Sequence, residues 1–118
     1  MTHDEIEVFA RGLYWLASRD GIEEREVTLI REFLVETKSE LQVADLQHGP
    51  FDPLEAAQVL ETTYLRRMFL KAAVALVRAD GVYSDAERHA LGRIADAFGL
   101  TNTEFGDLEQ EANATTLD

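Results

Sequence analysis

The sequence predicts an all-α fold, a single compact helical domain of about six to seven helices built on two quasi-repeated helix–Asp-Gly–helix units. Three observations support this. Apolar residues recur at helical spacing along nearly the whole chain. Only two prolines interrupt the pattern, and no alternation of period two is long enough for a strand. We expect one domain over residues 1–118, with 113–118 as a polar, frayed tail.

The first helix is predicted to begin at Thr2, because Thr2 and Glu5 have the spacing of a capping box. Gly21 is placed to end it, since glycine adopts the left-handed conformation after a helix at little steric cost. A second helix is expected over about 23–37. The apolar positions of this pair are Ile6, Phe9, Ala10, Leu13, Leu16, Ala17, Val27, Ile30, Phe33 and Leu34.

The middle of the chain contains the clearest loop. We predict a short helix over 39–46 and a loop over 47–51. Asp52 is a good N-cap, and Pro53 at the first helical position already has the required φ. The helix that begins there is expected to run to about Leu60.

The next helix is the most apolar of the chain. Thr62 or Thr63 is expected to cap it, and it should run to Val77. Because apolar residues cover much of its circumference, we expect it at the centre of the bundle.

Two further helices follow. Ser84 and Glu87 form a second capping box, and Gly99 with the apolar residue behind it is a good helix stop. The pair Thr101 and Glu104 then begins a last short helix, anchored by Phe105 and Leu108.

The two Asp-Gly turns are the most informative repeat. Residues 13–22 and 73–82 share an apolar helical run, Asp-Gly and a branched apolar residue, and acids follow each. The offset is 60 residues between Asp20 and Asp80 but 61 between Glu26 and Glu87. One interpretation is ordinary punctuation, in which glycine ends one helix, acids favour the start of the next, and Glu87 is occupied by the Ser84 amide.

The other interpretation is a metal site at the same turns. If the two helix pairs pack against each other, Asp20, Glu26, Asp80 and Glu87 come together. Two carboxylates about 5 Å apart repel by about 3 kcal/mol at an effective dielectric near 20, so a cation would relieve the cluster. Hard oxygen ligands suit calcium or magnesium, although neither segment has the ligand spacing of an EF-hand.

The second turn also carries a family resemblance. The pattern Ala79-Asp80-Gly81-Val82-x-Ser84-x-x-Glu87, followed by an apolar helix that ends at Phe98-Gly99-Leu100, resembles the TerB-like family. These bacterial domains are related to tellurite-resistance protein TerB and to the N-terminal region of the DjlA co-chaperone. The resemblance covers about 9–105 and implies an all-helical domain with a divalent-metal site at its acidic turns.

Carried over residue by residue, the resemblance matches Asp80 and Glu87 well, and it matches Asp20. Because the first copy is one residue shorter, it leaves open whether Glu26 or instead Glu23 or Glu24 is the fourth ligand.

Composition limits the function classes. The net charge is −12, from 23 acids against 11 bases, so the chain repels nucleic acid and anionic lipid surfaces. It contains no cysteine, which excludes thiolate chemistry and cysteine-based metal sites. No apolar run reaches the ~20 residues of a membrane span, and the first residues do not read as a signal peptide. We therefore expect a cytoplasmic protein without membrane insertion.

The remaining polar and aromatic candidates favour solvated or structural roles. His3, His48 and His89 lack ligand partners at metal-site spacing. Of Tyr14 and Trp15, at least one is expected in the core, and a partly exposed Trp15 would mark a contact surface. The adjacent Arg66 and Arg67 are interpreted as a solvated pair or as partners of nearby acids.

Together these features predict a non-enzymatic domain that binds calcium or magnesium through clustered carboxylates. The family resemblance implies a role in tellurite or stress response or in envelope-associated signalling, with a protein partner that the sequence does not identify. No nucleophile elbow or phosphate-binding glycine loop argues for catalysis. The alternative is a metal-free protein-interaction adaptor that uses an acidic or apolar helical face.

Overall fold

The computed structural model describes residues 1–47, 51–78 and 84–114, with only the backbone at Asp20 and at 112–114. These residues form seven α-helices and one 3₁₀ helix and contain no strand, so the predicted all-α class is confirmed. The elements are α1 (His3–Ala17), η1 (Ser18–Asp20), α2 (Glu24–Glu36), α3 (Val43–Leu46), α4 (Pro53–Val59), α5 (Thr63–Val77), α6 (Asp85–Ala97) and α7 (Asn102–Ala114).

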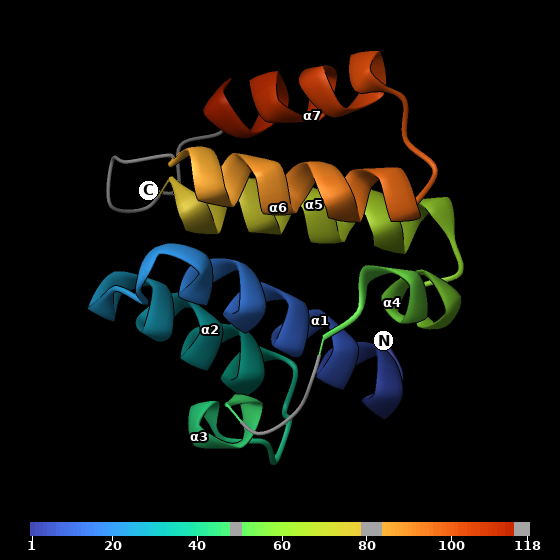
Figure 1. The fold of residues 1–118 in the computed structure, drawn as a ribbon. Coiled ribbons are helices and arrows are strands. Elements are labelled where there is room, and N and C mark those ends of the chain that lie inside the picture. Colours follow the sequence, from blue (N-terminus) through green and yellow to red (C-terminus); the bar gives the residue numbers. More distant parts are fainter. Residues whose placement is uncertain (48–50, 79–83, 115–118) are drawn as a thin grey trace.

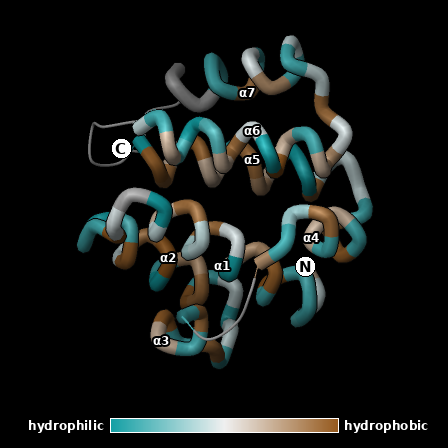
Figure 2. Tube along the Cα trace, viewed as in Figure 1, coloured by the Kyte–Doolittle hydropathy of each residue, from teal (hydrophilic) through white to brown (hydrophobic). Residues whose placement is uncertain are grey.

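Helix α5 lies at the centre, as its apolar circumference predicted. It packs against α1, α2, α6 and α7, while α1 also contacts α3 and α4 (Figure 1). Phe69, Leu70, Ala73, Val74 and Val77 of α5 are fully buried. Hydrophobic and hydrophilic residues alternate along the helices, as amphipathic packing requires (Figure 2).

An aromatic cluster joins four helices in the core. Phe9 of α1 stacks on Phe33 of α2 with ring centroids 4.7 Å apart, and meets the edge of Phe69 of α5 at 5.1 Å. Phe69 contacts Phe98, at the end of α6, at 5.8 Å. Aromatic pairs in such geometries each contribute about 1 kcal/mol beyond their buried area.

The predicted helix starts are confirmed by hydrogen bonds. The Glu5 amide donates to Thr2 Oγ1 at 3.2 Å, and the Glu104 amide donates to the hydroxyl of Thr101 at 3.1 Å. The Leu54 amide donates to Asp52 Oδ1 at 3.0 Å.

Of the two threonines proposed as the cap of α5, it is Thr62 that accepts from the Leu65 amide, at 3.1 Å. Helix α1 ends in the 3₁₀ turn before Gly21, which has φ +81° as predicted.

Two helix lengths differ from the prediction. The helix expected over 39–46 begins only at Val43, because Lys38 adopts a left-handed φ of 57° and the Leu41 amide donates to Ser39 Oγ in a turn. The last helix is 13 residues long rather than short. It continues to Ala114, and the buried Leu108 and the Lys71–Glu111 ion pair, at 2.8 Å, link it to the rest of the bundle. The predicted frayed tail therefore begins inside this helix, and 115–118 lie outside the described residues.

The interpretation of Arg66 as a solvated residue or a partner of acids was wrong. Its guanidinium donates to the backbone carbonyls of Ala57 and Leu60, both at 2.7 Å, and of Phe98 at 3.3 Å. These carbonyls belong to the ends of α4 and α6, where helical partners are missing. For Arg67 the interpretation was right, since it pairs with Glu104 at 3.1 Å.

Candidate metal centre

Two buried glutamates stand out among the described side chains. Glu26 is 1 % exposed and Glu87 is 4 % exposed, and no other charged residue in the described part of the chain is buried. Each is the third residue of its helix, in α2 and in α6. A buried carboxylate is costly unless hydrogen bonds or a positive charge compensate it. The two therefore need local compensation.

Backbone amides supply part of that compensation. Glu87 Oε1 accepts from the Ser84 amide at 3.0 Å and from the Ser84 hydroxyl at 3.1 Å. Glu26 Oε1 accepts from the Glu23 amide at 2.9 Å. Both carboxylates also lie at the positive N-terminal end of a helix dipole. The expected hydrogen bond from the Ser84 amide to Glu87 is thus confirmed, and Glu87 accepts it through the carboxylate oxygen Oε1.

The surroundings of the two glutamates lie at one end of the bundle. The 3₁₀ turn η1, which precedes α2, packs against α6. In Figure 1 the end of α5 and the start of α6 lie on the same side of the molecule as η1 and the start of α2. Neighbouring helix ends from both halves of the chain therefore meet there, as a shared site requires.

The side chains of the two aspartates, Asp20 and Asp80, are not among those that the structure describes. Asp80 lies outside the described residues, and of Asp20 only the backbone, at the end of η1, is described. Among the side chains that are described, no group of three or more histidines, aspartates or glutamates has an arrangement that would hold a metal ion. The four-carboxylate cluster, and with it the structural repeat of the Asp-Gly units, stays a prediction.

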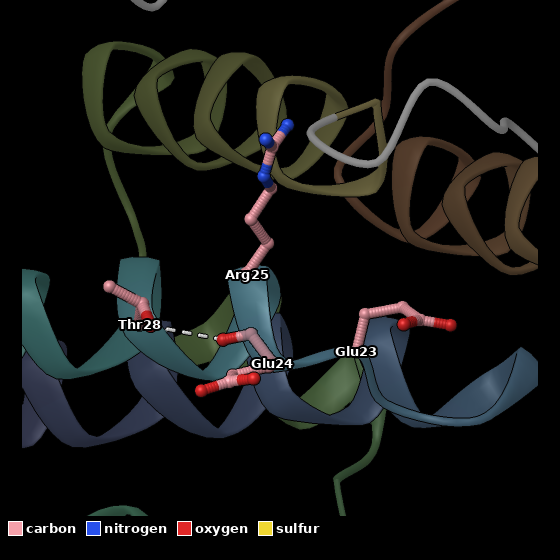
Figure 3. Close-up of a pocket in the computed structure, with 4 residues that line it drawn as sticks. All are labelled: Glu23, Glu24, Arg25 and Thr28. Atoms are coloured by element: carbon pink, nitrogen blue, oxygen red, sulfur yellow. Dashed lines mark hydrogen bonds between the residues drawn. The ribbon is translucent and has the colours of Figure 1, made fainter.

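Burial distinguishes among the three glutamates considered for the first turn. Glu23 and Glu24 are exposed, whereas Glu26 occupies the same buried helix position as Glu87. Glu23 and Glu24 line an open hollow of about 540 Å³ together with Arg25 and Thr28. Figure 3 shows their carboxylates pointing away from each other, with Arg25 directed elsewhere, so this hollow offers no converging ligands.

The described histidines differ from these two glutamates in burial. His3 and His89 are exposed, as expected of solvated side chains, and His48 lies outside the described residues.

The structure thus defines a class: a small all-helical domain with two acidic helix caps buried in its core. A family model described as "Tellurite resistance protein TerB" matches residues 2–110, nearly the whole chain. The chain belongs to the TerB family. Comparisons with curated proteins and with solved structures gave no match. Within the described ranges no helix is long and apolar enough to cross a membrane.

Proposed function

We propose that this domain binds a divalent cation, calcium or magnesium, through Asp20, Glu26, Asp80 and Glu87. The observation that supports it best is the burial of Glu26 and Glu87 at the same position of two helices whose starts lie at one end of the bundle. Carboxylate oxygens are the ligands both cations prefer.

The capping bonds are compatible with a cation. The Ser84 amide and the Ser84 hydroxyl both donate to Oε1 of the Glu87 carboxylate. Because a carboxylate has two oxygens, one can cap the helix while the other faces a cation. When bound, the cation would supply the positive charge that compensates the buried carboxylates.

The wider role follows from the family. We propose a non-enzymatic, cytoplasmic module in tellurite or stress response or in envelope-associated signalling, with the cation in a structural or switching role. The metal-free adaptor is the competing function. It is favoured by large apolar side chains that the structure leaves exposed, among them Val35 at 70 %, Leu54 at 65 % and Tyr64 at 74 %.

Thermal unfolding tests the cation. At about 100 times its Kd a ligand stabilises the folded state by about 2.7 kcal/mol, which raises the melting midpoint of a domain of this size by about 10 °C. The midpoint is measured in EDTA and in calcium, magnesium, manganese or zinc at constant ionic strength. Metal analysis of protein purified without chelators gives the occupancy.

Matched variants separate the site from general charge effects. Asp20→Asn with Asp80→Asn, and Glu26→Gln with Glu87→Gln, should abolish the shift, and the glutamines retain a capping oxygen. The control Glu23→Gln with Glu24→Gln removes the same charge from exposed positions at the start of α2 and should retain it. If no metal moves the wild-type midpoint by more than about 1 °C, the adaptor function replaces this one.

A further inference from the structure

Trp15 is the only tryptophan of the chain and lies half-buried near the end of α1. Three side chains lie against its indole, one from four residues further along the chain and two from distant parts of the sequence. The ring of Phe51 is 5.4 Å away, the guanidinium carbon of Arg19 lies 4.5 Å from the indole centroid, and that of Arg93 lies 5.9 Å from it. We call Trp15, Arg19, Phe51 and Arg93 the Trp15 surface.

The two arginines of this surface differ from other arginines of the chain in their ion pairs with the described acids. Arg11 and Arg67 each pair with a glutamate at 3.1 Å. Neither Arg19 nor Arg93 makes an ion pair with any acid among the residues that the structure describes, although both are exposed. Two positive charges therefore share one aromatic platform.

Arg19 is held in position by the protein itself. Its Nε donates to the Trp15 carbonyl at 2.9 Å, and its Nη2 donates to Ser18 Oγ at 3.4 Å. Stacking on an indole leaves the outer edge of a guanidinium available to a carboxylate. A side chain fixed in this way loses little entropy when a ligand binds.

An open hollow continues the surface on the side of Arg93. It has a volume of about 350 Å³ and is lined by Asp52, Pro53, Leu54, Arg93, Asp96 and Ala97. Leu54 is 65 % exposed there and offers an apolar contact. Asp52 accepts from the Leu54 amide at 3.0 Å, so the start of α4 partly compensates its charge.

We propose that the Trp15 surface and this hollow dock an acidic peptide segment of another protein. A carboxylate of the segment lies on the Arg19 and Arg93 guanidinium groups, and an apolar side chain next to it enters the hollow at Leu54. Asp52 and Asp96 also line the hollow, so the carboxylate is expected on the Arg19 side of the indole and only the apolar side chain in the hollow. A second copy of this chain, an anionic membrane or a nucleic acid would instead meet the full repulsion of the −12 net charge.

The fluorescence of Trp15 reports binding directly, because no other residue of the chain contains an indole. The probe is a short synthetic peptide of alternating glutamate and leucine, titrated into the full chain in EDTA so that the proposed cation plays no part. We expect a saturable change in emission that weakens as NaCl is added. The same peptide with lysine in place of glutamate, or with serine in place of leucine, should bind at least about tenfold more weakly.

Variants test the two arginines. Arg19→Gln with Arg93→Gln should weaken binding at least about tenfold, while Arg31→Gln with Lys38→Gln, an equal charge change on exposed residues of α2 and its end, should leave it unchanged. Circular dichroism checks that each variant folds, and the salt and peptide dependence of the wild type needs no variant.

Three results would overturn the proposal. They are the absence of a saturable Trp15 response to the acidic peptide, equal binding of the lysine peptide, and undiminished binding by the variant without the two arginines. A Trp15 response that depends on protein concentration alone would show that a second copy covers the surface instead.

Discussion

Arg66 and Arg67 are adjacent in sequence but differ in what they stabilise. Arg66 donates three hydrogen bonds to backbone carbonyls at the ends of α4 and α6 and lies 5.9 Å from the Phe98 ring centroid. Arg67 forms an ion pair with Glu104 in which both side chains are about two-fifths exposed. Carbonyls left without donors in a partly buried site are costly, whereas a solvent-screened ion pair contributes little.

Replacement of each arginine by methionine should reveal this difference. Arg66→Met is expected to lower the free energy of unfolding by about 2–3 kcal/mol, since three carbonyls lose their donor. Arg67→Met is expected to lower it by at most about 1 kcal/mol. Urea denaturation of the two variants measures both values. Equal losses would mean that Arg66 acts only as a surface charge.

At the scale of elements, the packing of α1 on α5 depends on a glycine inside a helix. A Cβ added at Gly12 would lie 2.7 Å from two atoms of the Phe69 ring and 3.0 Å from Phe51. Gly92, inside α6, would meet nothing within 4 Å. Helix propensity alone favours alanine over glycine by about 1 kcal/mol at both positions.

The two alanine variants are therefore expected to change stability in opposite directions. Gly92→Ala should raise the free energy of unfolding by about 0.5–1 kcal/mol. Gly12→Ala should lower it by about 1–3 kcal/mol, because Phe69 is fully buried and has no room to move aside. Thermal unfolding measures both midpoints, and a stabilised Gly12→Ala variant would contradict the close approach of α1 and α5.

The elements that the sequence predicted correctly are those set by local rules. The capping boxes at Thr2, Ser84 and Thr101 involve residues three apart, so spacing alone revealed them. The contacts that hold α7 are instead long-range, such as the ion pair of Glu111 with Lys71, which lies 40 residues earlier in the sequence. Spacing rules do not extend that far.

The candidate site, like the fold, was predicted from the sequence only where local spacing defines it. The sequence identified Glu87 through its capping box, but the one-residue offset between the two turns left three glutamates open for the first. Burial, which is a tertiary property, distinguishes Glu26 from the exposed Glu23 and Glu24, and the role of Glu26 as a metal ligand stays a prediction. The Trp15 surface was predicted only as a condition on the exposure of Trp15. Arg19 lies four residues after Trp15, but Phe51 and Arg93 come from distant elements that spacing rules do not connect to it.

Two ion pairs join helix α7 to α5, in addition to the packing of its buried Leu108. Hydrogen bonds from Thr101, with a smaller effect of the Arg67 charge, lower the pKa of Glu104 below its ordinary value of 4.5. A hydrogen bond from Lys71 and its charge lower the pKa of Glu111 in the same way. A carboxyl group whose pKa is lowered in the folded state stabilises that state above its ordinary pKa and loses this effect as the pH falls through the lowered value.

We therefore expect α7 to loosen before the rest of the bundle as the pH falls below about 4.5. Amide hydrogen exchange along α7 and α5, measured at several pH values after correction for intrinsic rates, should show protection lost first in α7. Glu104→Gln with Glu111→Gln should remove most of this pH dependence. The control Glu32→Gln with Glu36→Gln, on the exposed face of α2, should preserve it. Simultaneous loss of protection in both helices of the wild type would contradict the prediction.

At the scale of the whole molecule, the excess of acids acts against the compact state. With 23 acids and 11 bases, most carboxylates have no base available, and the described residues contain three ion pairs with lysine or arginine. Self-repulsion of this kind is spread over the surface and is screened by any salt. It must be separated from a specific cation site, which responds to the identity of the ion.

The two effects should appear as different dependences on salt. Raising NaCl from about 0.01 M to about 0.1 M shortens the screening length from about 30 Å to about 10 Å and should raise the melting midpoint of the wild type, and choline chloride should act equally. Calcium or magnesium, at an ionic strength already held near 0.1 M, should add a further increase that saturates. The variants at Asp20, Glu26, Asp80 and Glu87 should retain the first increase and lose the second. If divalent ions follow the same ionic-strength curve as NaCl, the carboxylates of the two turns are compensated by their helix caps alone, and charge screening accounts for the whole effect.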